Sequence, residues 1–162
     1  MRKPLNVMKI RPCQFLRSDP ISNTFGMVRT KHGKRKAHQG WDLDAAPGTP
    51  TFAIADGEIK AGISSTYGNW LSLKFSHKRK TYFAYYAHLS TYATVRQLQA
   101  VKEGDLIAFT GRSGNAGTIP LSESHLHFEV RTTEFPLGHK APLTGRVDPG
   151  EILGYEIYSS HV

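Results

Sequence analysis

Hydrophobic and polar residues alternate most clearly between Ser124 and Val130. The apolar positions are Leu126, Phe128 and Val130, and the polar positions are His125, His127 and Glu129. This period of two predicts a β-strand with one apolar and one polar face. Residues two apart on a strand project to the same side, about 6 to 7 Å from each other. His125 and His127 could therefore share one metal, or one could bind it while the other acts beside it. Two incidental histidines on a half-exposed strand are the alternative.

Further short runs rich in β-branched and aromatic residues occur between Gly, Pro, Asn and Asp residues, which favour turns. The predicted strands are 51–54, 57–61, 70–75, 81–86, 93–96 and 106–110. Asp56-Gly57 is a strong hairpin signal, and Val101–Asp105 is a second turn that precedes a strand. The best helix candidate, Thr94–Ala100, is short and begins with β-branched residues. Many short strands and almost no helix predict an all-β sandwich or barrel.

The chain of 162 residues has the length of a single domain with one core. Three prolines interrupt residues 1–22, which we expect to form an irregular lead-in. Residues 23–131 carry the predicted strands, and 132–162 read as a wrapping tail that contains three further prolines. The Gly-rich stretch 110–117 lacks the Lys-Ser/Thr ending of a phosphate-binding loop, so we exclude that class of site.

Composition narrows the class of protein. Hydrophobic residues make up 39% and charged residues 21% of the chain, as in ordinary soluble globular proteins. No apolar run reaches the length of a membrane span. The beginning of the chain is basic but lacks the apolar run of a signal peptide, so we expect no export signal of that kind. The single cysteine, Cys13, excludes an internal disulfide and is expected to be a buried or idle thiol.

The formal net charge of +8 is concentrated partly in two runs, 31–36 and 78–80. Such runs are usually solvated loops, but they also favour a polyanionic partner. Nucleic acid and an anionic bacterial cell wall both fit this charge, which does not distinguish between them.

Two further segments carry candidate metal ligands. In a fully extended strand His38 and Asp42 would lie roughly 13 Å apart, so the chain must bend between them to bind one ion. Gly40 is the residue best suited to that bend. His88 ends an aromatic run and, taken alone, reads as a structural histidine. Together, His38, Asp42 and His127 would form a His₂Asp set that leaves a fourth position for water, with His88 and His125 as spare bases.

The ordered set of motifs resembles the lysostaphin-like (LytM-type) zinc metallopeptidases, which cut peptide bonds in bacterial peptidoglycan. The resemblance runs from about His38 to Val130, and no single piece of it is specific. Its pieces are the H-x-G-x-D start, Ala55-Asp56-Gly57, Tyr67-Gly68-Asn69, Tyr86–Ser90, Val101–Asp105 and the H-L-H-F-E-V end.

The resemblance implies a compact antiparallel β-sheet core of the family's duplicated-hairpin, barrel-sandwich-like type with a groove across it. It implies one zinc ion per chain, bound by His38, Asp42 and His127, and a catalytic pair, His88 and His125. Zinc in such a site lowers the pKa of water to about 7 and polarises the scissile carbonyl. We favour His125 as the base, with His88 orienting water or steadying the oxyanion, and the two roles could be exchanged. No H-E-x-x-H helix supplies a glutamate base instead.

Other candidate residues are assigned no catalytic role. Thr118–Ser124 departs from the shorter link of many relatives, so we expect a different groove wall there. Glu129 and Asp44 are expected to support the ligands or lie at the surface. His32, His77, His139 and His161 are expected at the surface. The aromatic residues that we expect in the core or lining the groove are Tyr67, Trp70, Tyr85 and Tyr86.

Three alternatives compete with a peptidase. One is an inactive peptidoglycan-binding or regulatory module on the same fold, although all five key residues are present. Another is a nucleic-acid-binding protein, but the basic runs carry no recognisable binding motif, and we expect no specific nucleic-acid partner. A cupin would require Gly and Glu spacings around H-x-H that are absent.

The expected substrate is a peptidoglycan peptide, which lies outside the cytoplasm. The protein would therefore act in the periplasm or outside the cell, delivered as an antibacterial toxin by a secretion machine or released as a phage lysin, unless the sequence is cropped. A toxin would have a cognate immunity protein, and we expect a monomer with no membrane span.

Overall fold

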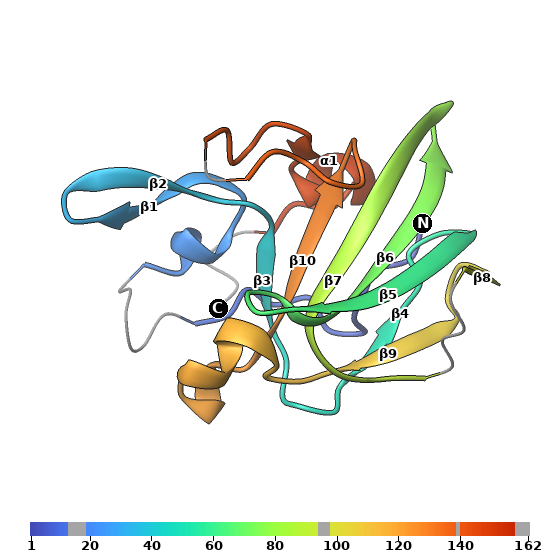
Figure 1. The fold of residues 1–162 in the computed structure, drawn as a ribbon, viewed down its shortest axis with the longest axis horizontal. Coiled ribbons are helices and arrows are strands. Elements are labelled where there is room, and N and C mark those ends of the chain that lie inside the picture. The colour runs from blue at the N-terminus through green and yellow to red at the C-terminus, as the bar shows by residue number, and fades with distance from the viewer. Residues whose placement is uncertain (13–18, 94–97, 139, 158–162) are drawn as a thin grey trace.

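The computed structural model describes residues 1–12, 19–93, 98–138 and 140–157. It is built almost entirely of antiparallel strands, as the alternation predicts (Figure 1). The strands are β1 (Gly26–Lys31), β2 (Lys34–His38), β3 (Trp41–Asp44), β4 (Pro50–Phe52), β5 (Gly57–Ser64), β6 (Gly68–His77), β7 (Lys80–Tyr92), β8 (Gln99–Val101), β9 (Leu106–Thr110), β10 (His125–Arg131) and β11 (Arg146–Val147). The helical segments are short: η1 (Pro20–Asn23), η2 (Gly114–Thr118), η3 (Leu121–Glu123) and α1 (Pro149–Leu153). The all-β fold is therefore confirmed.

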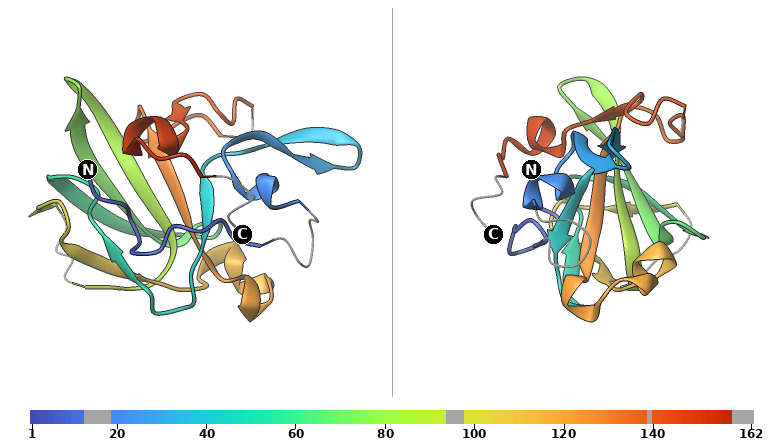
Figure 2. Two further views of the ribbon diagram at one scale, coloured as in Figure 1. Left: turned by 180° about the vertical axis from the view of Figure 1, so that it is seen from behind. Right: turned by 90° about the vertical axis from the view of Figure 1, so that its left-hand side faces the viewer.

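Nine strands form one curved sheet in the order β11-β10-β7-β6-β5-β8. Strand β3 pairs with β10, and β9 pairs with both β4 and β7. Strand β7 contains 13 residues and exchanges partners along its length, from β10 near its middle to β9 near its end. Because one long strand joins both parts, the sheet bends around on itself (Figure 2). Strands β1 and β2 form a separate two-stranded ribbon that projects from the body.

The core lies on the apolar side of β10. Leu126, Phe128 and Val130 are completely buried, as the alternation predicts. Phe128 is paired in register with Tyr86 of β7, and the two rings meet edge to face with centroids 5.1 Å apart. Burying one such aromatic side chain contributes roughly 1.5 to 3 kcal/mol. The core therefore fixes which face of β10 presents the histidines.

The lead-in and the tail both reach β3 and β10. Ile10 forms an isolated bridge with Leu43 of β3, so this part of the lead-in lies along that strand. In the tail, β11 pairs with the end of β10. The helix candidate Thr94–Ala100 is wrong at its end, because Gln99 and Ala100 belong to β8. Its other part, like most of the predicted strand 93–96, lies outside the described residues.

Candidate metal centre

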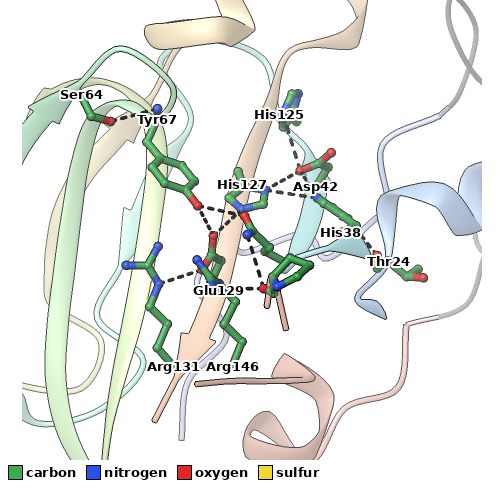
Figure 3. A network of polar contacts seen from close by, with 12 residues as sticks. Thr24, His38, Asp42, Ser64, Tyr67, His125, His127, Glu129, Arg131 and Arg146 are labelled. Atoms are coloured by element: carbon green, nitrogen blue, oxygen red, sulfur yellow. Dashed lines mark hydrogen bonds and ion pairs between the residues drawn. The ribbon is translucent and has the colours of Figure 1, made fainter. Parts of the chain in front are cut away.

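The three predicted ligands converge from three strands. His38 ends β2, Asp42 lies on β3, and His127 is paired in register with Asp42 across β3 and β10. His38 Nε2 lies 3.1 Å from Asp42 Oδ1 and 3.3 Å from His127 Nδ1, and His127 Nδ1 lies 2.8 Å from the same Asp42 oxygen (Figure 3). All three residues are buried. The structure thus brings together residues 89 positions apart in the chain.

Gly40 allows this convergence, and the chain bends there, between β2 and β3, as predicted. A Cβ there would overlap the Phe128 carbonyl oxygen and lie 2.9 Å from its carbonyl carbon. The close approach of the two backbones therefore requires glycine because it has no side chain, and a left-handed backbone conformation is not involved.

The outer nitrogen of each candidate ligand, His38 and His127, is hydrogen-bonded to another part of the chain. His38 Nδ1 lies 2.8 Å from the Thr24 carbonyl oxygen, and His127 Nε2 lies 3.0 Å from Glu129 Oε1. Because these oxygens can only accept, each outer nitrogen is the donor, and the inner nitrogen carries the lone pair when the ring is neutral. Two imidazole lone pairs and a carboxylate oxygen therefore face one another.

This donor set fits a zinc ion. Ligands at about 2.0 to 2.2 Å from a tetrahedral metal lie roughly 3.3 Å from one another, and the three donor atoms are separated by 2.8 to 3.3 Å. Without a cation the facing acceptors would repel. Burial lowers the pKa of His127, but its hydrogen bonds to Asp42 and Glu129 outweigh burial and raise it to about 9. At neutral pH, His127 of the metal-free protein would therefore carry a second proton, which a bound metal would displace.

Asp42 is held as a carboxylate from two sides. Burial raises its pKa, but His38, His125 and His127 around it outweigh burial and hold the pKa well below its ordinary value. Its second oxygen, Oδ2, accepts a hydrogen bond of 2.8 Å from Arg29 Nη2 and lies 3.9 Å from Arg11 Nη1. Oδ1 is thereby left to face His38 and His127.

Glu129 supports His127 from a fully buried position, so the surface alternative for Glu129 is wrong. Besides His127, it accepts hydrogen bonds from the Tyr67 hydroxyl (2.9 Å), Arg131 Nε (2.7 Å) and Arg146 Nε (2.8 Å) (Figure 3). Four donors satisfy a charge that would otherwise be costly to bury. Burial and the adjacent Glu129 raise the pKa of Tyr67 to about 12, so its hydroxyl remains a donor at neutral pH.

His88 and His125 lie beside the metal donors with their ring centroids 5.2 Å apart. His88 Nδ1 donates to the Ser113 carbonyl oxygen (2.9 Å), and His125 Nδ1 donates to the Glu123 carbonyl oxygen (3.0 Å). Each Nε2 is therefore free to accept a proton, and that of His125 lies 3.7 Å from Asp42 Oδ1. Burial, together with His127 and His125, lowers the pKa of His88 to about 3. Burial also lowers the pKa of His125, although Asp42 opposes it.

His88 reaches this position through an unusual backbone conformation. Its φ is +60°, in the left-handed region that non-glycine residues rarely adopt. Regular alternation along β7 would place it on the core face with Tyr86, whereas Ala87 shares the face of His127. The left-handed conformation of His88 turns its imidazole to the other face. The His88 amide donates a hydrogen bond of 2.8 Å to the Tyr67 carbonyl oxygen. Such conformations cost about 1 to 3 kcal/mol and concentrate at functional sites.

Arg11 and Glu123 form a buried ion pair behind His125. The Arg11 guanidinium also lies 3.5 Å from His125 Nδ1, and the Arg11 amide donates to the Asp42 carbonyl oxygen. Glu123 ends η3, within the stretch 118–124 that we expected to depart from relatives. The lead-in and this stretch are thus joined at the back of the candidate site.

Sequence patterns gave no signal for Arg11, Arg29 or Arg146, whereas Arg131 continues the alternation of His127 and Glu129.

A cavity of about 310 Å³ opens at these residues. Its walls are the end of β2, the turn before β6 and the segment around η2, and Thr118 and Ile119 are among the lining residues. The departing stretch therefore begins in the cavity wall. Tyr67 also lines the cavity, Tyr86 lies in the core, and Trp70 stacks on the buried Tyr85.

The remaining histidines lie away from this centre. His32 is exposed, as predicted, but His77 is only partly exposed and packs against Tyr82. Asp44, beside the candidate ligand Asp42, donates its backbone amide to the Lys9 carbonyl oxygen of the lead-in. Cys13, His139 and His161 lie outside the described residues. Among the residues that the structure describes, no helix is long and apolar enough to cross a membrane.

Comparison with known proteins gives matches over most of the chain. A model of Peptidase family M23 matches residues 36–139. The cell division protein DipM of Caulobacter vibrioides is 36% identical over 140 residues, which are 85% of this chain and 20% of DipM. The peptidoglycan DD-endopeptidase ShyC of Vibrio cholerae is 32% identical over 75% of this chain and 25% of its own length. The murein hydrolase activator NlpD of Escherichia coli is 33% identical over 70% of this chain and 29% of its own.

The fold matches solved structures as well. The catalytic domain of the antimicrobial peptidase lysostaphin from Staphylococcus simulans superimposes with a TM-score of 0.62 and 27% sequence identity, covering 82% of this chain and 90% of that domain. The curated relatives are much longer, since the chain spans between 20% and 29% of their lengths.

Proposed function

The chain belongs to peptidase family M23, and we propose that it is a zinc-dependent endopeptidase that cuts peptide bonds in bacterial peptidoglycan. One observation carries the proposal. Three buried donors converge within hydrogen-bonding distance of one another, and two further imidazoles stand beside them with Nε2 free. A structural metal site would not need the two additional bases.

We assign His38, Asp42 and His127 as the ligands of one zinc ion. When bound, zinc supplies a Lewis acid that polarises the scissile carbonyl and acidifies water. The chain's own residues hold the ligands in place. Thr24 and Glu129 fix the tautomers of the two histidines, and this fixation of ligand orientation is typical of metal sites.

We assign proton transfer to His125 and His88. His125 accepts the proton of the attacking water at Nε2 and then donates it to the leaving amine, because its ring is held by the Glu123 carbonyl and lies near Asp42. His88 approaches from β7 and orients the water or stabilises the oxyanion. Both rings sit on backbone carbonyl acceptors, so neither can turn away without losing a hydrogen bond.

A regulatory module is the second candidate, because one relative is named a murein hydrolase activator. The five residues argue for catalysis instead, since an activator does not need two free imidazoles beside a complete ligand set. One experiment distinguishes a catalytic protein from one that only binds peptidoglycan. Zinc-loaded protein is incubated with purified peptidoglycan, and the soluble fragments are identified by mass spectrometry.

We expect fragments that carry new amino and carboxyl termini at one peptide bond. The His125→Ala protein serves as the control, because it should bind the same polymer and release nothing. If the wild-type protein releases no fragments while it sediments with peptidoglycan, it is a binding or regulatory module.

We further propose that the protein acts at the cell wall as an antibacterial effector or lysin. Its substrate is absent from the cytoplasm, so expression there should be tolerated. Fusion to a secretory signal should cause rounding or lysis of a Gram-negative host, and the His125→Ala fusion should be harmless. Toxicity confined to the cytoplasm would point to an intracellular target, such as nucleic acid.

A further inference from the structure

The first basic run, 31–36, forms the outer end of the projecting β1–β2 ribbon and is not an irregular loop. Lys31 and Lys34 flank a two-residue turn, His32-Gly33, in which both residues have positive φ (51° and 72°). This is the geometry of a tight type I′ hairpin. The seven residues 30–36 are all exposed, and outside itself the ribbon packs mainly against η1 (Figures 1 and 2).

Four cations share one face of this ribbon. Lys31 is paired in register with Lys34, and Arg29 with Lys36. Residues directly opposite each other, and residues two apart on one strand, project from the same face. We call these four residues the lysine face. Two like-charge pairs stand directly opposite each other, which destabilises a sheet, and the ribbon contains no acidic residue.

The lysine face leads into the candidate metal centre. On β2, Lys34, Lys36 and His38 follow one another at intervals of two, so all three project from one face. On β1, Arg29 already donates to Asp42, and it lines the cavity together with His38. None of the three lysines has an ion-pair partner in the described part of the chain. The cationic strip therefore begins at the cavity wall and ends in solvent at the hairpin tip.

We propose that the lysine face extends the substrate groove and binds free carboxylates of the peptidoglycan peptide on one side of the bond that is cut. The inference rests on the proposed function for the identity of the polymer. Lys36 and Lys34 lie about 7 and 13 Å along the strand from His38, and an extended peptide advances at the same rate. The carboxylates would therefore lie about two and four residues from the cleaved bond.

The second basic run provides a matched control. Lys78, Arg79 and Lys80 form the tip of the β6–β7 hairpin, outside the cavity lining. Lys31→Gln/Lys34→Gln/Lys36→Gln and Lys78→Gln/Arg79→Gln/Lys80→Gln each remove three positive charges from an exposed hairpin. Both are combined with His125→Ala so that binding is measured without cleavage. Their affinities are compared on purified peptidoglycan and on peptidoglycan whose carboxyl groups have been converted to amides.

We expect the lysine-face variant to bind native peptidoglycan about tenfold more weakly, because three exposed ion pairs contribute modestly each. The control variant should change by less than about twofold. On amidated peptidoglycan all proteins should bind alike, and near 1 M salt, where the Debye length is about 3 Å, the difference should vanish. The midpoint temperature of thermal unfolding of the lysine-face variant should be unchanged or slightly higher, since the substitutions relieve like-charge repulsion.

Equal losses in the two variants, or an equal loss on amidated polymer, would show general charge attraction and overturn the proposal. A loss that appears on a DNA duplex and not on peptidoglycan would identify nucleic acid as the partner and overturn it too. If the wild-type protein cleaves peptidoglycan and the lysine-face variant binds it as tightly, the proposed function stands and the role of the lysine face is wrong. If the lysine face binds carboxylates but the wild-type protein does not cleave, the role of the lysine face stands and the proposed function is wrong.

Discussion

Removal of Arg11 should destabilise the protein far more than removal of an exposed arginine or lysine. The side chains of Arg11 and Glu123 are 6% and 2% exposed, so Arg11→Met leaves the Glu123 carboxylate buried without its ion-pair partner. Breaking a buried pair from one side costs about 3 to 5 kcal/mol. Since domains of this size are stable by roughly 5 to 15 kcal/mol, the loss is a large fraction of the total.

The double variant Arg11→Met/Glu123→Leu removes both charges and should recover most of that loss. The measurement is urea unfolding of the metal-free protein, in which the midpoint and slope give the free energy of unfolding. Lys60→Met provides the matched control, because the Lys60–Glu134 pair is partly exposed (43% and 34%) and should contribute less than about 1 kcal/mol. Glu123→Leu alone is measured as well. If the losses in unfolding free energy of the two single variants add up to that of the double variant, Arg11 and Glu123 do not interact, and the ion pair that joins the lead-in to the segment before His125 is wrong.

Three further predictions concern the centre itself. His125→Ala and His88→Ala should retain zinc while turnover falls about 10² to 10⁴-fold; a variant purified without metal would show that the replaced histidine is a ligand. Gly40→Ala should lose zinc in elemental analysis, because its Cβ would push the Phe128 backbone, and with it His127, away from His38; full zinc occupancy would contradict this packing. Zinc binding near pH 7.5 should release a proton, because the pKa of His127 is raised to about 9 and the metal must displace its proton. Binding should therefore weaken as the pH falls, and calorimetric heats independent of the buffer would refute the proton release.

The sequence predicted the strands whose side chains alternate. Strand β10 and its apolar face follow directly from Leu126, Phe128 and Val130, and β9 has the predicted bounds, 106–110. The meeting of His38 and Asp42 with His127 also followed, once the family resemblance joined segments that are distant in the chain. Local periodicity was sufficient in these regions because one face of each strand is buried.

Other features depend on long-range contacts that periodicity does not contain. His88 reaches the centre because its own backbone is left-handed within β7, so its side chain lies on the opposite face from the one that alternation predicts. Glu129 is buried because Arg146 comes from the tail to neutralise it. The basic run 31–36 reads as a loop, since like charges disfavour strand pairing, yet the turn at His32-Gly33 forms a hairpin. In each case a tertiary contact or turn geometry overrides the local pattern.

The central claim is tested most directly by a zinc titration of activity. Protein stripped of metal receives increasing amounts of zinc, and the rate at which new amino groups appear in purified peptidoglycan is followed. We predict a rate that rises linearly and stops rising near one equivalent of zinc per chain, with no rise for His127→Ala. A rate that is already present in the stripped protein, or absent at every zinc concentration, would contradict the assignment of this chain as a zinc peptidase.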